Sequence, residues 1–173
     1  MSLSLRPYLV DYAEVLAAIG SKSLPIYDRV FESTADIASG RQLTVVQAFL
    51  DGRLNDPKLS ESYLAGFELL CAAFGQLAES CQGKLEGIAP EWLETEGEEI
   101  LDTLHNSDDL GVEFPGDDCA FYLAHDSIVD ELQSFKEADL SPLPVAAREG
   151  LEELIRWLEE ARIKQKDLVI LLG

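Results

Sequence analysis

Apolar side chains recur along the chain at two spacings, and each spacing predicts a different kind of element. Between residues 60 and 80 they return every three or four positions, which places them on one face of an α-helix. The same spacing predicts further helices over about 11–19, 24–33, 43–51, 89–95, 97–105, 127–136 and 144–163. Short alternating or continuous apolar runs predict strands over 3–9, 110–114, 119–124 and 168–172.

Capping and turn residues indicate where several of these elements begin. Asp11, followed three residues later by Glu14, resembles a capping box at the start of the first helix. Thr44 is a candidate cap for the helix over 43–51. Pro7 lacks a backbone N–H, which favours an edge position or a bulge in the first strand. Pro115-Gly116 predicts a turn between two strands.

Helices therefore dominate, and the strands come from both ends of the chain and from near 110–124. The run Leu168–Leu172 is apolar at every position, which is typical of a central strand buried on both faces. Trp157 lies just off the apolar stripe of the 144–163 helix. A helical body packed on one small sheet, with the two terminal strands as neighbours, buries all of these faces. The sequence thus predicts an α+β fold and a single domain over 1–173, a length sufficient for one core.

Charge is distributed unevenly along this chain. It has 33 acidic and 13 basic residues, for a net charge of −20. Residues 85–135, called the acidic segment below, contain 15 acidic residues and no Lys or Arg, so the other 122 residues carry only −5. This balance argues against binding nucleic acid through a basic surface and against adhesion to anionic lipid.

Carboxylates concentrated in this way repel one another, and a positively charged partner would relieve the repulsion. Trp92 lies beside them, and an aromatic ring among acidic groups can anchor a basic residue. We therefore expect a non-enzymatic interaction protein, resembling an immunity protein, that binds a basic protein partner. The candidate contact residues are Trp92, Glu94, Glu98, Glu99, Asp102, Asp108, Asp109, Asp117 and Asp118. Two alternatives stay open: the carboxylates are spread over solvated helix faces, or they hold a cation.

An enzyme is the main alternative function. The two histidines, His105 and His125, each lie close to aspartates in the sequence, and an imidazole beside a carboxylate can act as an acid, a base or a ligand. A small hydrolase or a metal-dependent enzyme would use His125, Asp126 and His105. Cys119 is a candidate nucleophile beside His125, although residues 119, 121 and 123 share a strand face that is typical of core.

The common catalytic and binding motifs are absent from the sequence. It contains no His-Glu-x-x-His, no Gly-rich phosphate-binding loop, no Gly-x-Ser-x-Gly and no EF-hand loop. We therefore expect no cofactor and no metal, and we favour binding over catalysis. A third alternative is self-association through the apolar run at 168–172, which would be hazardous as an exposed edge.

Cysteine usage and hydropathy indicate a compartment. The chain has three cysteines, no Cys-x-x-Cys pair and no apolar stretch approaching the length of a membrane span. Its first residues lack the pattern of a secretory signal. We therefore expect reduced thiols and a cytoplasmic protein.

Several features of the last third of the chain match a known family. Phe114-Pro115-Gly116, the following strand, the amphipathic helix over 144–163 and the terminal run Val169–Gly173 resemble the YfbM-like family, a group of small uncharacterised bacterial proteins. The opening strand and helix over 3–19 are compatible with it. The resemblance implies an α+β fold and a bacterial origin. It implies no activity and no catalytic residue.

Overall fold

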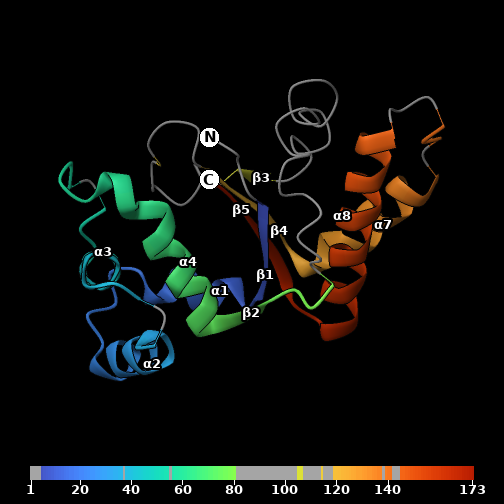
Figure 1. The fold of residues 1–173 in the computed structure, drawn as a ribbon. Helices are drawn as coiled ribbons and strands as arrows, with labels where there is room; N and C mark the ends of the chain where they lie inside the picture. The colour runs from blue at the N-terminus through green and yellow to red at the C-terminus, as the bar shows by residue number, and fades with distance from the viewer. Residues whose placement is uncertain are drawn as a thin grey trace.

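A central antiparallel sheet organises the molecule (Figure 1). The computed structural model describes residues 5–36, 38–54, 56–80, 105–106, 114, 119–137, 139–141 and 145–173. Its strands are β1 (Leu5–Val10), β2 (Gly75–Leu77), β3 (His105–Asn106), β4 (Cys119–Leu123) and β5 (Asp167–Leu172). They lie in the order β2-β1-β5-β4-β3, and each neighbouring pair is antiparallel.

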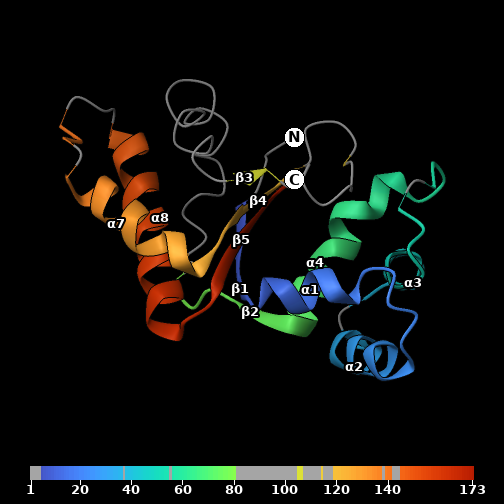
Figure 2. The same cartoon turned by 180° about the vertical axis from the view of Figure 1, so that it is seen from behind.

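Helices cover both faces of this sheet, so the protein has three layers (Figure 2). The helices are α1 (Tyr12–Ala18), α2 (Leu24–Thr34), α3 (Gly40–Leu50), α4 (Tyr63–Phe74), α7 (His125–Glu137) and α8 (Val145–Lys164). The group α1 to α4 packs on one face and the pair α7 and α8 on the other. None of the described helices is both long and apolar enough to cross a membrane.

Strand β5 occupies the centre of the sheet and contributes to both cores. Leu168 and Ile170 pack with α7 and α8, whereas Val169 and Leu171 pack with α1 to α4. Its neighbours are β1 and β4, so the terminal strands lie side by side as predicted. The α+β fold predicted from the sequence is confirmed. Because β5 is paired on both sides, the apolar run at its end is not an exposed edge, which removes the reason given for self-association.

Pro7 occupies a position in β1 where a missing N–H is harmless. β1 has a neighbour on each side, but β2 pairs only with Tyr8 to Val10. The carbonyl oxygen of Pro7 accepts a hydrogen bond from the Ala78 N–H, 2.9 Å away, so this side of Pro7 faces the end of β2. The N–H and C=O of a strand residue point to the same side, and the absent donor therefore falls where the ladder stops.

The helix predicted over 60–80 is wrong at its end, because α4 ends at Phe74 and the chain enters the edge strand β2. Only glycine fits at position 75, because the backbone there lies directly against β1 and leaves no room for a side chain. A Cβ atom there would lie 2.2 Å from the carbonyl oxygen of Leu9. Pairing with a strand distant in sequence therefore overrides the helical pattern of Leu77 and Ala78.

Two predicted helix starts are also corrected. α3 begins at Gly40 rather than 43, because Ser39 and Gln42 form a capping box. Thr44 lies inside that helix, where its hydroxyl donates to the Gly40 carbonyl at 2.9 Å. α7 begins at His125 rather than 127. The cap of α3 is therefore present in the sequence at Ser39, whereas the first N–H of α7 is bound by a residue distant in sequence, Asp167.

Trp157, which lies just off the apolar stripe of α8, belongs to the core between α8 and the sheet, where only 1% of it is exposed. The helices predicted over 89–95 and 97–105 and the strand over 110–114 lie outside the described residues, apart from His105, which belongs to β3, and Phe114.

Candidate functional site

The predicted partner-binding residues, from Trp92 to Asp118, all lie outside the described residues. The described part of the acidic segment includes the first three turns of α7. There, Asp126 and Asp130 are exposed and one turn apart, and Val129 between them is 54% exposed. We call these three residues the α7 acidic face.

Six cationic side chains in the described part pair with carboxylates that lie outside the acidic segment. The pairs are Arg6–Glu68, Arg29–Glu14, Arg41–Glu61, Arg53–Asp51, Lys136–Glu159 and Lys164 with both Glu79 and Glu160. Most are surface pairs that stabilise the fold only slightly. They nevertheless engage nearly half of the chain's 13 basic residues away from the carboxylates of the acidic segment.

The sheet brings the two histidines to the same end. In the β3–β4 pair the backbone of His105 lies opposite Tyr122, and α7 begins three residues later at His125. The ring Nδ1 of His125 is buried and has no hydrogen-bond partner among the described residues. Asp126, which follows it, is exposed. The structure thus brings the backbones of the two histidines to one end of the sheet.

Cys119 is placed at the opposite end of β4. Its backbone pairs with Leu172, whereas Leu123 pairs with Leu168 near the start of β5. Four residues of extended strand span about 14 Å, which is too far for a thiol at 119 to reach the ring of His125. The structure therefore does not bring together the nucleophile–base pair considered from the sequence.

One carboxylate organises this end of the sheet. The two oxygens of Asp167 accept hydrogen bonds from the backbone N–H groups of Tyr12, at 2.9 Å, and His125, at 2.8 Å. These are the first residues of α1 and α7, so Asp167 caps two helices. The rings of Tyr12 and Tyr122 stack beside it with centroids 3.8 Å apart. Burial, followed by the charges of Asp167 and Asp126, raises the pKa of Tyr122.

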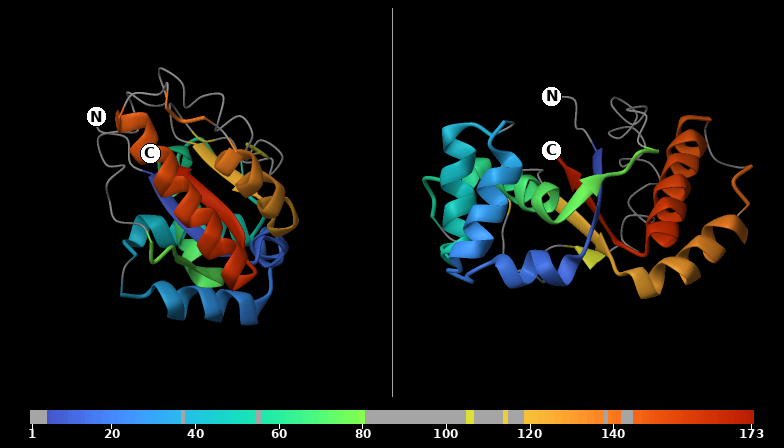
Figure 3. Two further views of the ribbon diagram at one scale, coloured as in Figure 1. Left: turned by 90° about the vertical axis from the view of Figure 1, so that its right-hand side faces the viewer. Right: turned by 90° about the horizontal axis from the view of Figure 1, so that it is seen from below.

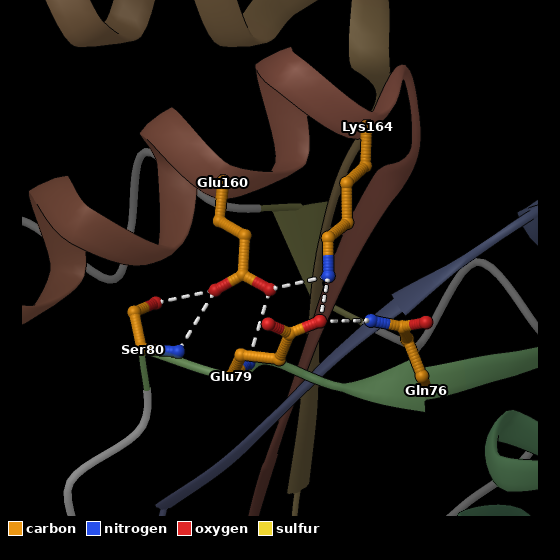
Figure 4. Close-up of polar contacts among 5 residues, drawn as sticks. All are labelled: Gln76, Glu79, Ser80, Glu160 and Lys164. Atoms are coloured by element: carbon orange, nitrogen blue, oxygen red, sulfur yellow. Dashed lines mark hydrogen bonds and ion pairs between the residues drawn. The ribbon is translucent and has the colours of Figure 1, made fainter.

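A second carboxylate joins α8 to the chain that follows β2 (Figure 4). Glu160 accepts hydrogen bonds from the Ser80 N–H at 2.9 Å, the Ser80 hydroxyl at 2.6 Å and the Glu79 N–H at 3.0 Å. Lys164 pairs with Glu160 at 3.0 Å and with Glu79 at 2.6 Å. Burial alone would raise the pKa of Glu160, but these hydrogen bonds outweigh it and lower the pKa to about 2.

Next to this cluster is a hollow of about 420 Å³ whose wall holds three cations, Arg29, Lys164 and Lys166. We call it the cationic hollow. Leu9, Ala73 and Phe74 form its apolar wall, and Gly75 and Gln76 of β2 complete it. These residues come from both faces of the sheet and from its edge strand, so no local sequence motif signals the site.

The end of α8 places two of these cations. Gln165 adopts a left-handed conformation with φ 53°. The Lys166 N–H then donates to the Ala161 carbonyl at 3.0 Å and the Gln165 N–H to the Arg162 carbonyl at 3.3 Å. This is a Schellman ending, which stops the helix and directs the chain into β5. It sets Lys164 and Lys166 beside the edge of the sheet.

Comparison with known proteins gives a family but no activity. The model of a domain of unknown function, DUF7691, matches residues 1–173. The chain belongs to the DUF7691 family. Searches of curated proteins and of solved structures found no match. The DUF7691 match does not bear on the YfbM-like resemblance, which stays a prediction. Within the described part of this DUF7691 chain, no group of three or more His, Cys, Asp or Glu residues is placed to hold a metal ion.

Proposed function

We propose that this DUF7691 protein is a non-enzymatic interaction module that binds a basic protein partner through its acidic segment. The observation that carries the proposal is the separation of charge. Residues 85–135 hold 15 carboxylates and no Lys or Arg. Six of the cations elsewhere are already paired with carboxylates outside that segment.

The side chains of the α7 acidic face support the binding of a basic partner. Two like charges one helical turn apart, such as Asp126 and Asp130, destabilise a helix by about 0.3 kcal/mol. A cation from a partner would remove that repulsion. The exposed Val129 between them offers an apolar contact at the same place. A surface of this kind steers a basic partner electrostatically and speeds its association, as an immunity protein or an electrostatic mimic would.

The proposal is tested by neutralising carboxylates in two matched sets. The acidic-segment set is Glu98→Gln, Glu99→Gln, Asp108→Asn and Asp109→Asn. The control set is Glu32→Gln, Glu152→Gln, Asp28→Asn and Asp36→Asn, all of them exposed residues outside the segment. Both sets change the net charge equally and replace the same residue types. Only the location of the lost charge therefore differs between them.

Each protein is used to capture partners from a lysate, and any captured protein is identified by mass spectrometry. We expect the wild type and the control set to retain one basic protein at about 50 mM salt and to release it at about 0.5 M salt, where screening shortens to a few ångströms. The acidic-segment set should lose it at both. Equal capture by the two sets, or capture that salt does not weaken, would contradict the proposal.

A second candidate function is a hydrolase or metal-dependent enzyme that uses His125, Asp126 and His105. It is favoured by the β3–β4 pairing, which brings both histidines to one end of the sheet. Zn²⁺ binding measured by calorimetry, and hydrolysis of p-nitrophenyl acetate, would both be expected of the wild type and lost in His125→Gln. A wild type that neither binds Zn²⁺ nor hydrolyses the ester contradicts this candidate.

A further inference from the structure

We propose that the cationic hollow binds a small organic anion, namely a phosphate or carboxylate group carried on an apolar body. None of the residues that line this site belongs to the acidic segment, and the site does not depend on the proposed partner. Its walls contain three of the 13 basic residues of a chain whose net charge is −20. A positive charge without a carboxylate partner is required if such a protein is to hold an anion, because its overall field repels one.

Two of the three cations are held in position by neighbouring side chains. The Arg29 guanidinium pairs with Glu14 at 3.0 Å and lies 4.3 Å above the centre of the Phe74 ring. The Lys164 ammonium is held by Glu79 and Glu160 (Figure 4), and Glu160 is itself fixed by three hydrogen bonds. Of the described residues that line the hollow, none is a carboxylate. Arg29 and Lys164 are thus oriented in advance, but their carboxylate partners offset their charges, so Lys166 supplies the positive charge that no described carboxylate pairs with.

Lys166 is the third cation, and it is the one of the three that forms no ion pair with a described residue. Its ammonium makes no ion pair or hydrogen bond with another described residue, although its backbone is fixed by the Schellman ending of α8. A charged oxyanion in the hollow would supply that missing partner. Hydrogen bonds between an ammonium and an oxyanion are about twice as strong as those between neutral groups.

The remaining walls determine what the anion is attached to. Leu9, Ala73 and Phe74 give the hollow an apolar side, and Gln76 adds an amide. A volume of about 420 Å³ exceeds what an inorganic ion requires and falls within the range of small-molecule sites. The hollow thus fits an oxyanion that carries an aromatic or aliphatic group.

The test is titration of the whole protein, followed through the backbone amide NMR signals. The probes are phenyl phosphate, benzoate, inorganic phosphate and benzyl alcohol. We expect saturable shifts at Gly75 and Gln76 with phenyl phosphate or benzoate, and whichever of the two binds more tightly identifies the anionic group. The apolar wall should make that probe bind at least about fivefold more tightly than inorganic phosphate, and benzyl alcohol should not bind.

Variants at Lys166 test whether the ammonium group of this residue binds the anionic probe. Lys166→Gln should weaken binding at least about tenfold, whereas Lys166→Arg should retain it. Lys58→Gln, an equal charge change at an exposed residue outside the hollow, should have no effect. Absent shifts at Gly75 and Gln76, equal binding of benzyl alcohol, or equal affinities of the Lys166→Gln and Lys58→Gln variants would overturn the proposal. The acidic-segment set should bind phenyl phosphate as tightly as the wild type does. The anion-binding proposal can therefore hold or fail independently of the proposal about a basic partner.

Discussion

Asp167 accepts a hydrogen bond of 2.8 Å from the backbone N–H of His125, and its second oxygen holds the start of α1 in the same way. The two helices it caps lie on opposite faces of the sheet, as the view from below shows (Figure 3). A single residue at the start of the central strand therefore connects all three layers. An aspartate that precedes an apolar strand gives no sign of this role in the sequence, because both of its partners are distant.

Replacing Asp167 by Ala should lower the free energy of unfolding by about 2 kcal/mol, since each of the two backbone N–H groups that lose their acceptor costs about 1 kcal/mol. Asp167→Asn keeps one acceptor oxygen and should lose about half as much. Urea unfolding measures both, with the exposed Asp28→Ala as the control. A loss in Asp167→Ala no larger than in the control would show that the double cap is not stabilising.

Glu160 should make stability depend on pH in the acidic range. Its pKa is lowered from the usual 4.5 to about 2 in the folded protein. The deprotonated carboxyl therefore stabilises the fold fully above about pH 5, and this contribution is lost as the pH falls through the interval toward 2. Glu160→Gln should unfold more readily than the wild type at pH 7, and the difference should shrink as the pH approaches 2. Glu152→Gln, an exposed change on the same helix, should show no such trend.

Gln165 is a position where glycine should be better than the native residue. Its φ of 53° is left-handed, which disfavours side chains with a Cβ. Gln165→Gly should raise the free energy of unfolding by about 0.5–1 kcal/mol. Glu152→Gly, in the interior of the same helix, should instead lower it by about 1 kcal/mol. Destabilisation by both changes in thermal unfolding would contradict the assigned helix ending.

Gly75 should not tolerate a larger residue. A Cβ there would lie 2.2 Å from the Leu9 carbonyl oxygen and 2.6 Å from a methyl carbon of Val10, so β1 and β2 would have to separate. Gly75→Ala should cost about 3 kcal/mol of stability, the upper part of the range for overpacking. At Gly40 nothing lies within 4 Å of the same position, and Gly40→Ala should leave stability nearly unchanged. Similar unfolding midpoints for the two variants would show that β2 does not pack closely on β1.

Helices and strands whose apolar spacing matches the way they pack could be predicted from the sequence. Helix α8 and strand β5 were predicted within a residue or two, because each carries a complete apolar pattern and packs as that pattern requires. Strand β2 could not be predicted, since Leu77 and Ala78 continue the helical spacing and only the edge of β1 makes them extended. Trp157 lies just off the stripe and is buried as well, because the core between α8 and the sheet extends beyond the stripe.

The two candidate sites also differ in whether a local stretch of sequence reveals them. The acidic segment could be recognised from the sequence because its charge is local, although its predicted contact residues lie outside the described part of the chain. The cationic hollow could not, because its lining residues come from β1, α2, the junction of α4 with β2 and the end of α8, which are distant from one another in sequence. Long-range assembly of this kind leaves no pattern along the chain.

In the proposed function the acidic segment, rather than the net charge as a whole, binds the basic partner. The most direct measurement is the affinity of a fluorescent ten-residue Lys/Arg peptide for the wild type and for the two matched sets of carboxylate variants, at several salt concentrations. We expect the acidic-segment set to bind at least about fivefold more weakly than the control set, with a smaller salt dependence. Equal affinities and equal salt dependence for the two sets would contradict the claim, because they would show that only the total charge matters.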